Sequence, residues 1–102
     1  MPDKNPIRKA LKVANKKDYA RLLELIMPTP LQYDIIRLRW MGFHPDDFPS
    51  LSSKYRKGER LSVIQVAQAL NISRETVMDH SKQILRRIER TDFLEWFNKS
   101  GP

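Results

Sequence analysis

The segment Leu61 to Ile88, LSVIQVAQALNISRETVMDHSKQILRRI, constrains the fold of this chain more than any other, because its spacing predicts two helices joined by a tight turn. Ser62 and Gln65 have the spacing of a capping box, which predicts that the first helix begins there. Its apolar side chains then recur at helical spacing. They are Val63, Val66, Ala67 and Leu70.

The turn and the second helix follow directly. Asn71 tolerates the left-handed backbone conformation that ends many helices, and Ser73 is a good N-cap for a helix that begins at Arg74. Val77 begins an inner apolar stripe that continues along this helix. The segment 62–90 is therefore predicted to be a helix-turn-helix.

The outer face of the second helix is polar, and its residue types suit contacts with a DNA major groove. We expect the first turns to contact base edges and other basic or hydroxyl groups to contact phosphates. The predicted base contacts are Arg74, Glu75, Met78 and Asp79. The predicted phosphate contacts are Ser73, Lys82, Arg86, Lys54, Arg56, Lys57, Lys12 and Lys16. The alternative is a helical hairpin whose charged face is only solvated, with Glu75 favouring the helix dipole and Arg74, Asp79 and Lys82 pairing locally.

Length and charge narrow the possible classes of protein. With 102 residues the chain is expected to form a single domain, 1–102, and its formal net charge of +7 favours a polyanionic partner. It has no cysteine and two isolated histidines, His44 and His80, so neither a metal site nor any other cofactor is expected. A glycine-rich phosphate loop and a nucleophile motif are also missing, so an enzyme is not expected. No apolar run reaches membrane-spanning length, which predicts a cytoplasmic protein.

The N-terminal part, 7–27, is predicted to form two basic helices. The first has an apolar stripe beginning at Ile7 and a basic outer face that includes Lys12, and Lys16 follows it. This face suits a phosphate backbone, although a solvated surface helix or weak binding to a membrane surface would have the same pattern. Asp18 is predicted to cap the second helix.

A supporting helix is predicted over 30–41. Thr29 and Gln32 have capping-box spacing around Pro30, and Gly42 is a suitable stop.

The long connection 43–61 separates this helix from the helix-turn-helix. Phe43 and Phe48 are expected to anchor it to the core, and its basic residues either contact a DNA backbone or form a solvated loop tip.

A short C-terminal helix is predicted over 92–98, capped by Thr91 or Asp92. Its large apolar residues either close the core over the N-terminal helices or provide a homodimer contact through Trp96 and Phe97. The expected fold is all-α, a small helical bundle of five to six helices containing a helix-turn-helix.

Two bacterial families resemble parts of this sequence. The stretch MPTPLQYDIIRLRWMG resembles the helix that opens the fourth region of sigma factors and also the start of the LuxR-type DNA-binding domain. Ser73-Arg74-Glu75 is similar to the Thr-Arg-Glu run of primary sigma factors, and Leu85-Arg86-Arg87-Ile88 to their Leu-Arg-Lys-Leu ending. Thr76-Val77, His80 and Ile84 are similar to the LuxR-type pattern.

The resemblance implies that Arg74 and Glu75 contact base edges. Asp79 stands where sigma factors have a base-contacting glutamine, so a different promoter preference is implied. The connection 43–61 is longer than in either family, which implies a stand-alone regulator of the kind found in phages, plasmids and other mobile elements.

The predicted function is sequence-specific binding of double-stranded DNA in transcription regulation. One alternative is a sigma-like module that docks on RNA polymerase or another regulator. Another is a DNA-organising component of a phage or plasmid machine.

Overall fold

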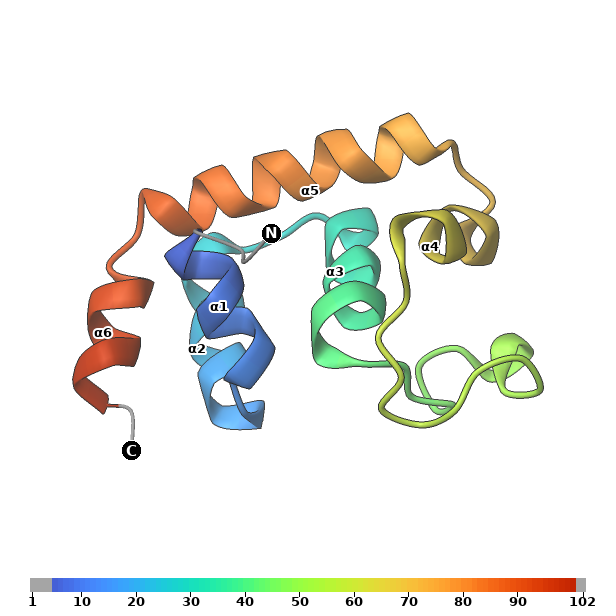
Figure 1. Cartoon of the computed structure of the whole chain (residues 1–102), viewed down its shortest axis with the longest axis horizontal. Helices are drawn as coiled ribbons and strands as arrows, with labels where there is room; N and C mark the ends of the chain where they lie inside the picture. The colour runs from blue at the N-terminus through green and yellow to red at the C-terminus, as the bar shows by residue number, and fades with distance from the viewer. Residues whose placement is uncertain (1–4, 101–102) are drawn as a thin grey trace. The chain divides into compact units, whose positions relative to one another are not determined.

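The computed structural model describes residues 5–100, and within this range every regular element is helical (Figure 1). The prediction of an all-α fold with five to six helices is therefore confirmed for the described part of the chain. The elements are α1 (Pro6–Val13), α2 (Lys16–Ile26), α3 (Pro30–Ile36), the π-helical segment η1 (Arg37–Met41), the short 3-10 helix η2 (Pro49–Leu51), α4 (Val63–Leu70), α5 (Arg74–Glu89) and α6 (Phe93–Ser100).

The chain divides into two compact units. Unit 1 combines the N-terminal residues as far as Pro28 with the residues from Lys82 onward, and unit 2 is Thr29–Ser81. Helix α5 begins in unit 2 and ends in unit 1. Unit 2 contains the helix-turn-helix as far as Ser81, so it also contains all four predicted base contacts.

Unit 2 begins with the predicted supporting helix. Thr29 Oγ1 accepts a hydrogen bond from the Gln32 N–H, and the Thr29 N–H donates to Gln32 Oε1, each at 3.2 Å, so the expected capping box is present. The helix is α-helical only to Ile36 and continues as the π-helical segment η1, which the sequence pattern did not predict. Gly42 ends it with a positive φ of 102°, as expected.

The long connection is closed at its base, and we call it the closed loop (43–59). The Phe43 N–H donates to Glu59 O and the Gly58 N–H donates to Phe43 O, both at 2.7 Å. The Phe43 ring is fully buried and lies 6.4 Å from the Phe48 ring and 5.8 Å from the Tyr55 ring, centroid to centroid. The predicted anchoring by Phe43 is confirmed, and Phe48 contributes as a half-buried partner.

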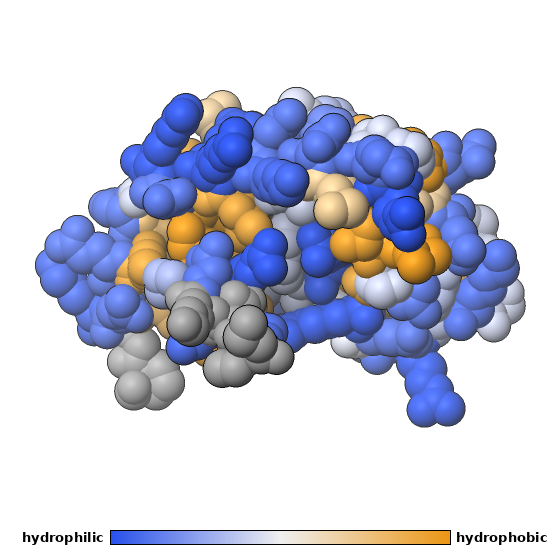
Figure 2. Space-filling model, turned by 45° about the horizontal axis from the view of Figure 1, so that its top comes forward, coloured by the Kyte–Doolittle hydropathy of each residue, from blue (hydrophilic) through white to orange (hydrophobic). Residues whose placement is uncertain are grey.

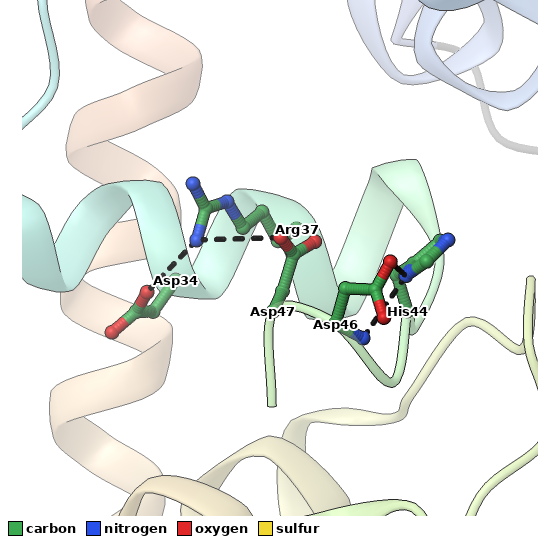
Figure 3. A network of polar contacts seen from close by, with 5 residues as sticks. All are labelled: Asp34, Arg37, His44, Asp46 and Asp47. Carbon is green, nitrogen blue, oxygen red and sulfur yellow. Dashed lines mark hydrogen bonds and ion pairs between the residues drawn. The ribbon is translucent and has the colours of Figure 1, made fainter. Parts of the chain in front are cut away.

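Arg37 links the supporting helix to the closed loop (Figure 3). Its Nη1 lies 3.9 Å from Asp34 Oδ1 and 4.0 Å from Asp47 Oδ1, and its guanidinium lies 3.7 Å from the centre of the Tyr33 ring. Burial lowers the pKa of Arg37, but hydrogen bonding and charge interaction with Tyr33, together with the two carboxylates, outweigh burial and raise it. Arg37 is therefore a permanent cation between two acids, one of them in the loop.

Unit 1 contains α1, α2 and α6 with the last part of α5. The prediction that Asp18 caps the second helix is wrong by three residues. Asn15 is the N-cap: its Oδ1 accepts from the Asp18 N–H at 2.9 Å, and Asp18 Oδ2 accepts from the Asn15 N–H at 2.9 Å. Asp18 completes the capping box from inside the helix. The first turn of α2 therefore begins at Lys16, earlier than its apolar pattern indicates.

Helix α6 packs against α1 and α2 in unit 1. Thr91 Oγ1 accepts from the Phe93 N–H at 3.1 Å, so Thr91 supplies the side-chain hydrogen bond at the start of this helix. Phe93 is fully buried, whereas Trp96 and Phe97 are half-buried. The expected closure of the core over the N-terminal helices is carried mainly by Phe93. A homodimer contact through Trp96 and Phe97 stays a prediction.

None of the helices in the described range is long and apolar enough to cross a membrane.

Candidate nucleic-acid interface

The helix-turn-helix begins and turns as its sequence predicts. Ser62 Oγ accepts from the Gln65 N–H at 3.2 Å, and the Ser62 N–H donates to Gln65 Oε1 at 2.9 Å. Asn71 adopts the left-handed conformation with φ 55° and ψ 48°, and the following Ile72 N–H donates to Ala67 O at 3.0 Å. This last bond returns to the final turn of α4, where Ala67 O also accepts from the Asn71 N–H, so it fixes the exit of the chain from the helix.

Ser73 caps the start of α5. Its Oγ accepts from the Thr76 N–H at 3.0 Å and lies 2.7 Å from Thr76 Oγ1, with which it shares a further hydrogen bond. Arg74 is consequently the first residue of the helix. The hydroxyl of Ser73 is engaged in the cap, so its predicted phosphate contact stays a prediction beside this structural role.

The inner side of the first half of α5 is held by apolar packing and by hydrogen bonds. Val77 is fully buried, and Ser81 is only 4% exposed. Ser81 Oγ donates to Val77 O at 2.6 Å and accepts from Arg39 Nη1 of η1 at 2.8 Å. This bond fixes the rotation of α5 relative to the supporting helix, since it joins one side chain from each.

A second polar contact lies one residue earlier on α5. Gln32 Nε2 lies 3.5 Å from His80 Nδ1, while Gln32 Oε1 is taken by the capping box of α3. His80 is half-buried.

Sequence reasoning missed the supporting roles of Gln32, Arg39 and Ser81. A signal existed for Ser81, because it lies four residues after Val77 and so interrupts the inner apolar stripe with a polar residue. Nothing comparable indicated Arg39, since its reach to α5 depends on the π-helical segment.

The outer side of the first half of α5 contains the four predicted base contacts. Arg74, Glu75, Met78 and Asp79 are all exposed, Met78 by 44%. Hydrophilic side chains predominate along the upper edge of the space-filling view, with paler and more hydrophobic ones among them (Figure 2). Among residues 5–100, Arg74, Glu75 and Asp79 form no side-chain hydrogen bond or ion pair, so the local pairing considered from the sequence is not found there.

The four side chains lie on one helix face. Arg74 and Met78 are four residues apart, as are Glu75 and Asp79, so they form two adjacent rows. The rise of about 1.5 Å per residue spreads the set over about 8 Å of helix. This patch, which we call the outer patch of α5, combines a guanidinium donor, two carboxylate acceptors and a thioether.

Apart from Ser73, the predicted phosphate contacts of unit 2 lie in the closed loop. Lys54, Arg56 and Lys57 are exposed. The backbone around them is turned by a hydrogen bond from the Arg56 N–H to Glu59 Oε1 at 3.0 Å and by another from the Glu59 N–H to Arg56 O at 3.0 Å. The loop therefore presents three cations from an ordered turn.

In unit 1 the remaining predicted phosphate contacts are exposed as well. Lys12 lies in the last turn of α1, Lys16 is the first residue of α2, and Lys82 and Arg86 lie one turn apart on α5.

No group of three or more acidic or histidine side chains within residues 5–100 is placed to hold a metal ion. Comparisons with protein-family models, with curated proteins and with solved structures gave no match.

Proposed function

We propose that this protein is a sequence-specific regulator of transcription that binds double-stranded DNA, with the first turns of α5 in the major groove. The observation that carries the proposal is the outer patch of α5. Four side chains suited to base edges are exposed on one side of a helix that Val77 and Ser81 hold from its inner side. A helix of about 10–12 Å diameter fits a groove about 12 Å wide.

Each member of the patch has a chemical role in this proposal. Arg74, at the helix N-terminus, donates two parallel hydrogen bonds to the O6 and N7 atoms of guanine. Glu75 and Asp79 accept hydrogen bonds from the amino group of cytosine. Met78 offers an apolar contact to a thymine methyl group. The exposed cations of the closed loop contact phosphates and position the domain.

The charge pattern of the outer patch supports binding over a purely solvated helix. Helix surfaces gain about 0.2–0.5 kcal/mol from opposite charges four residues apart and lose a similar amount from like charges. Glu75 and Asp79 are like charges at this spacing, and Arg74 is paired at this spacing with uncharged Met78. The outer patch therefore contains no stabilising ion pair of its own, and its one favourable electrostatic contribution is that of Glu75 in the first turn of α5.

Selection of binding sites from random duplex DNA tests the proposal directly. The wild-type chain should enrich a defined site. Arg74→Ala should weaken binding to that site by about 1–3 kcal/mol, roughly 5- to 150-fold, and should relax the preference at one base pair. Arg74→Lys keeps the charge without the two-pronged geometry, so it should lose the preference while retaining more affinity.

Arg56→Ala is the matched control, because it removes the same charge from the closed loop. It should weaken all sequences alike and leave the selected site unchanged. Absence of enrichment by the wild-type chain would rule out sequence-specific binding. If Arg74→Ala left both affinity and preference intact, the outer patch of α5 would not be the recognition surface.

The arrangement of the selected site bears on the number of copies bound. A palindromic site would indicate a dimer with two half-sites about one helical turn apart, and an asymmetric site would indicate a monomer. Transcription from a template carrying the site, with and without the protein, tests the regulatory role in the bacterial cytoplasm that we propose. Capture of RNA polymerase from nuclease-treated lysate would instead favour the protein-docking alternative.

A further inference from the structure

Unit 1 contains a groove that includes no residue of the outer patch of α5. Its volume is about 710 Å³, and its walls come from the start of α1, the last part of α5 and the segment that leads into α6. All of its lining residues belong to unit 1. The groove is therefore a feature of this unit, separate from the outer patch of α5 in unit 2.

Three cations stand among the residues that line the groove. Arg8, Lys82 and Arg86 line it and are exposed, and Glu89 is the acid among the lining residues. Three positive charges against one negative charge leave a net charge of +2. Apolar side chains complete the lining, among them exposed Pro6 and half-buried Leu94, so a ligand in the groove meets both charged and apolar groups.

The cations are spaced along the groove. Lys82 and Arg86 are four residues apart on α5, which separates them by about 6 Å along the helix axis. Arg8 comes from the first turn of α1, and its backbone N–H is held by Asn5 Oδ1 at 3.4 Å. The N-terminal end of α1 adds a partial positive charge on the same side.

We propose that this groove binds the phosphodiester backbone of DNA without regard to sequence. Cations from two helices, spaced over several ångströms, suit successive phosphates of an extended polyanion better than one small anion. Two of the three are arginines, whose planar guanidinium matches the geometry of a phosphate.

The proposal that the groove binds a polyanion rests on its own cations, and only the choice of DNA as that polyanion rests on the proposed function. Sequence recognition belongs to the outer patch of α5, whereas the groove in unit 1 would supply a salt-dependent share of affinity that is equal for all sequences. The two roles are consequently separable by experiment.

The test is the salt dependence of binding to a random-sequence duplex by the full chain. Each phosphate contact adds about 0.9 to the slope of log affinity against log salt concentration, so a chain with Arg8→Gln, Lys82→Gln and Arg86→Gln should lose about 2.7 from that slope. Each single change should lose about 0.9. The single variants keep the test decisive if the triple variant unfolds, which circular dichroism and thermal melting would reveal.

The matched control removes three positive charges of unit 1 that do not line the groove. It combines Lys17→Gln, Arg90→Gln and Lys99→Gln, all at exposed positions. The salt slope of this control variant should fall by less than one relative to the wild-type chain. Equal losses in the two triple variants would overturn the proposal, because bulk charge would then explain the effect. Binding of poly-glutamate is measured with the same variants. If the groove variants lost poly-glutamate binding while the salt slope of their DNA binding stayed unchanged, the proposal would also be overturned, since the groove would then bind an acidic polypeptide.

The two proposals fail in different ways. Enrichment of a defined site together with an unchanged salt slope in the groove variants would refute the groove inference and leave sequence recognition standing. A reduced slope without any enriched site would support the groove and refute sequence-specific recognition.

Discussion

Replacement of Gly42 by alanine is the sharpest test of how the closed loop is held. Gly42 has φ 102° and ψ 146°, a region that residues with a side chain rarely occupy. A Cβ atom at this position would lie 2.8 Å from the carbonyl oxygen of Gly58, which is backbone and cannot swing away. The same stretch of backbone carries the two hydrogen bonds that close the loop. The substitution therefore combines backbone strain with a steric conflict at the base of the loop.

The expected cost follows from these two contributions. Holding a residue with a side chain in this conformation costs about 1–3 kcal/mol. Moving Gly58 away by a few tenths of an ångström weakens one or both closing hydrogen bonds, each of which contributes about 0.5–1.5 kcal/mol. Gly42→Ala should accordingly destabilise unit 2 by about 2–4 kcal/mol.

Gly58→Ala is the matched control. Gly58 also has a positive φ, of 88°, but a Cβ atom there would meet nothing within 4 Å. Its cost should be limited to the conformational contribution, about 1–2 kcal/mol. Urea unfolding followed by tryptophan fluorescence measures both, and Trp40 of unit 2 provides a local signal. If Gly42→Ala cost no more than Gly58→Ala, the argument from the close approach of the two glycines would be refuted.

Three further substitutions test the helix ends and the support of α5, each by thermal or urea unfolding. Asn15→Ala should cost about 0.5–2 kcal/mol and more than Asp18→Ala, because Asn15 is the N-cap of α2, and the opposite order would restore Asp18 to that role. Asn71→Ala should cost about 1–2 kcal/mol through its left-handed backbone, and Asn71→Gly should recover most of this loss; equal losses would contradict the conformational explanation. Ser81→Ala should cost about 1–3 kcal/mol by removing the acceptor for Arg39, and a neutral result would mean that this bond does not hold α5.

Helix ends were the most predictable part of this molecule. Ser62 with Gln65, Thr29 with Gln32, and Asn71 all act where the sequence places them, because each bond is made within a few residues of chain and depends little on tertiary packing. Asp18 is the instructive exception. Both Asn15 and Asp18 are good caps, and the choice between them depended on where the preceding helix ends.

Features that join distant parts of the chain were not predictable. The bond between Arg39 and Ser81 spans 42 residues and requires the π-helical turn that contains Arg39. The pairing of Phe43 with Gly58 and Glu59 likewise depends on the close approach of two glycines. Sequence periodicity reports which face of an element is buried, but it does not report which polar groups will meet across that face.

These long-range contacts also determine whether the outer patch of α5 can discriminate between bases. Hydrogen bonds to base edges require a side chain held within about 0.5 Å of its productive position. The Ser73 cap fixes where α5 begins, and the bond between Ser81 and Arg39 fixes its rotation, so Arg74 starts from a defined point and direction. The residues that give this helix its proposed specificity therefore include two that would never touch DNA. Ser81 and Arg39 act through the orientation of α5, and changes there should reduce discrimination between sequences more than overall affinity.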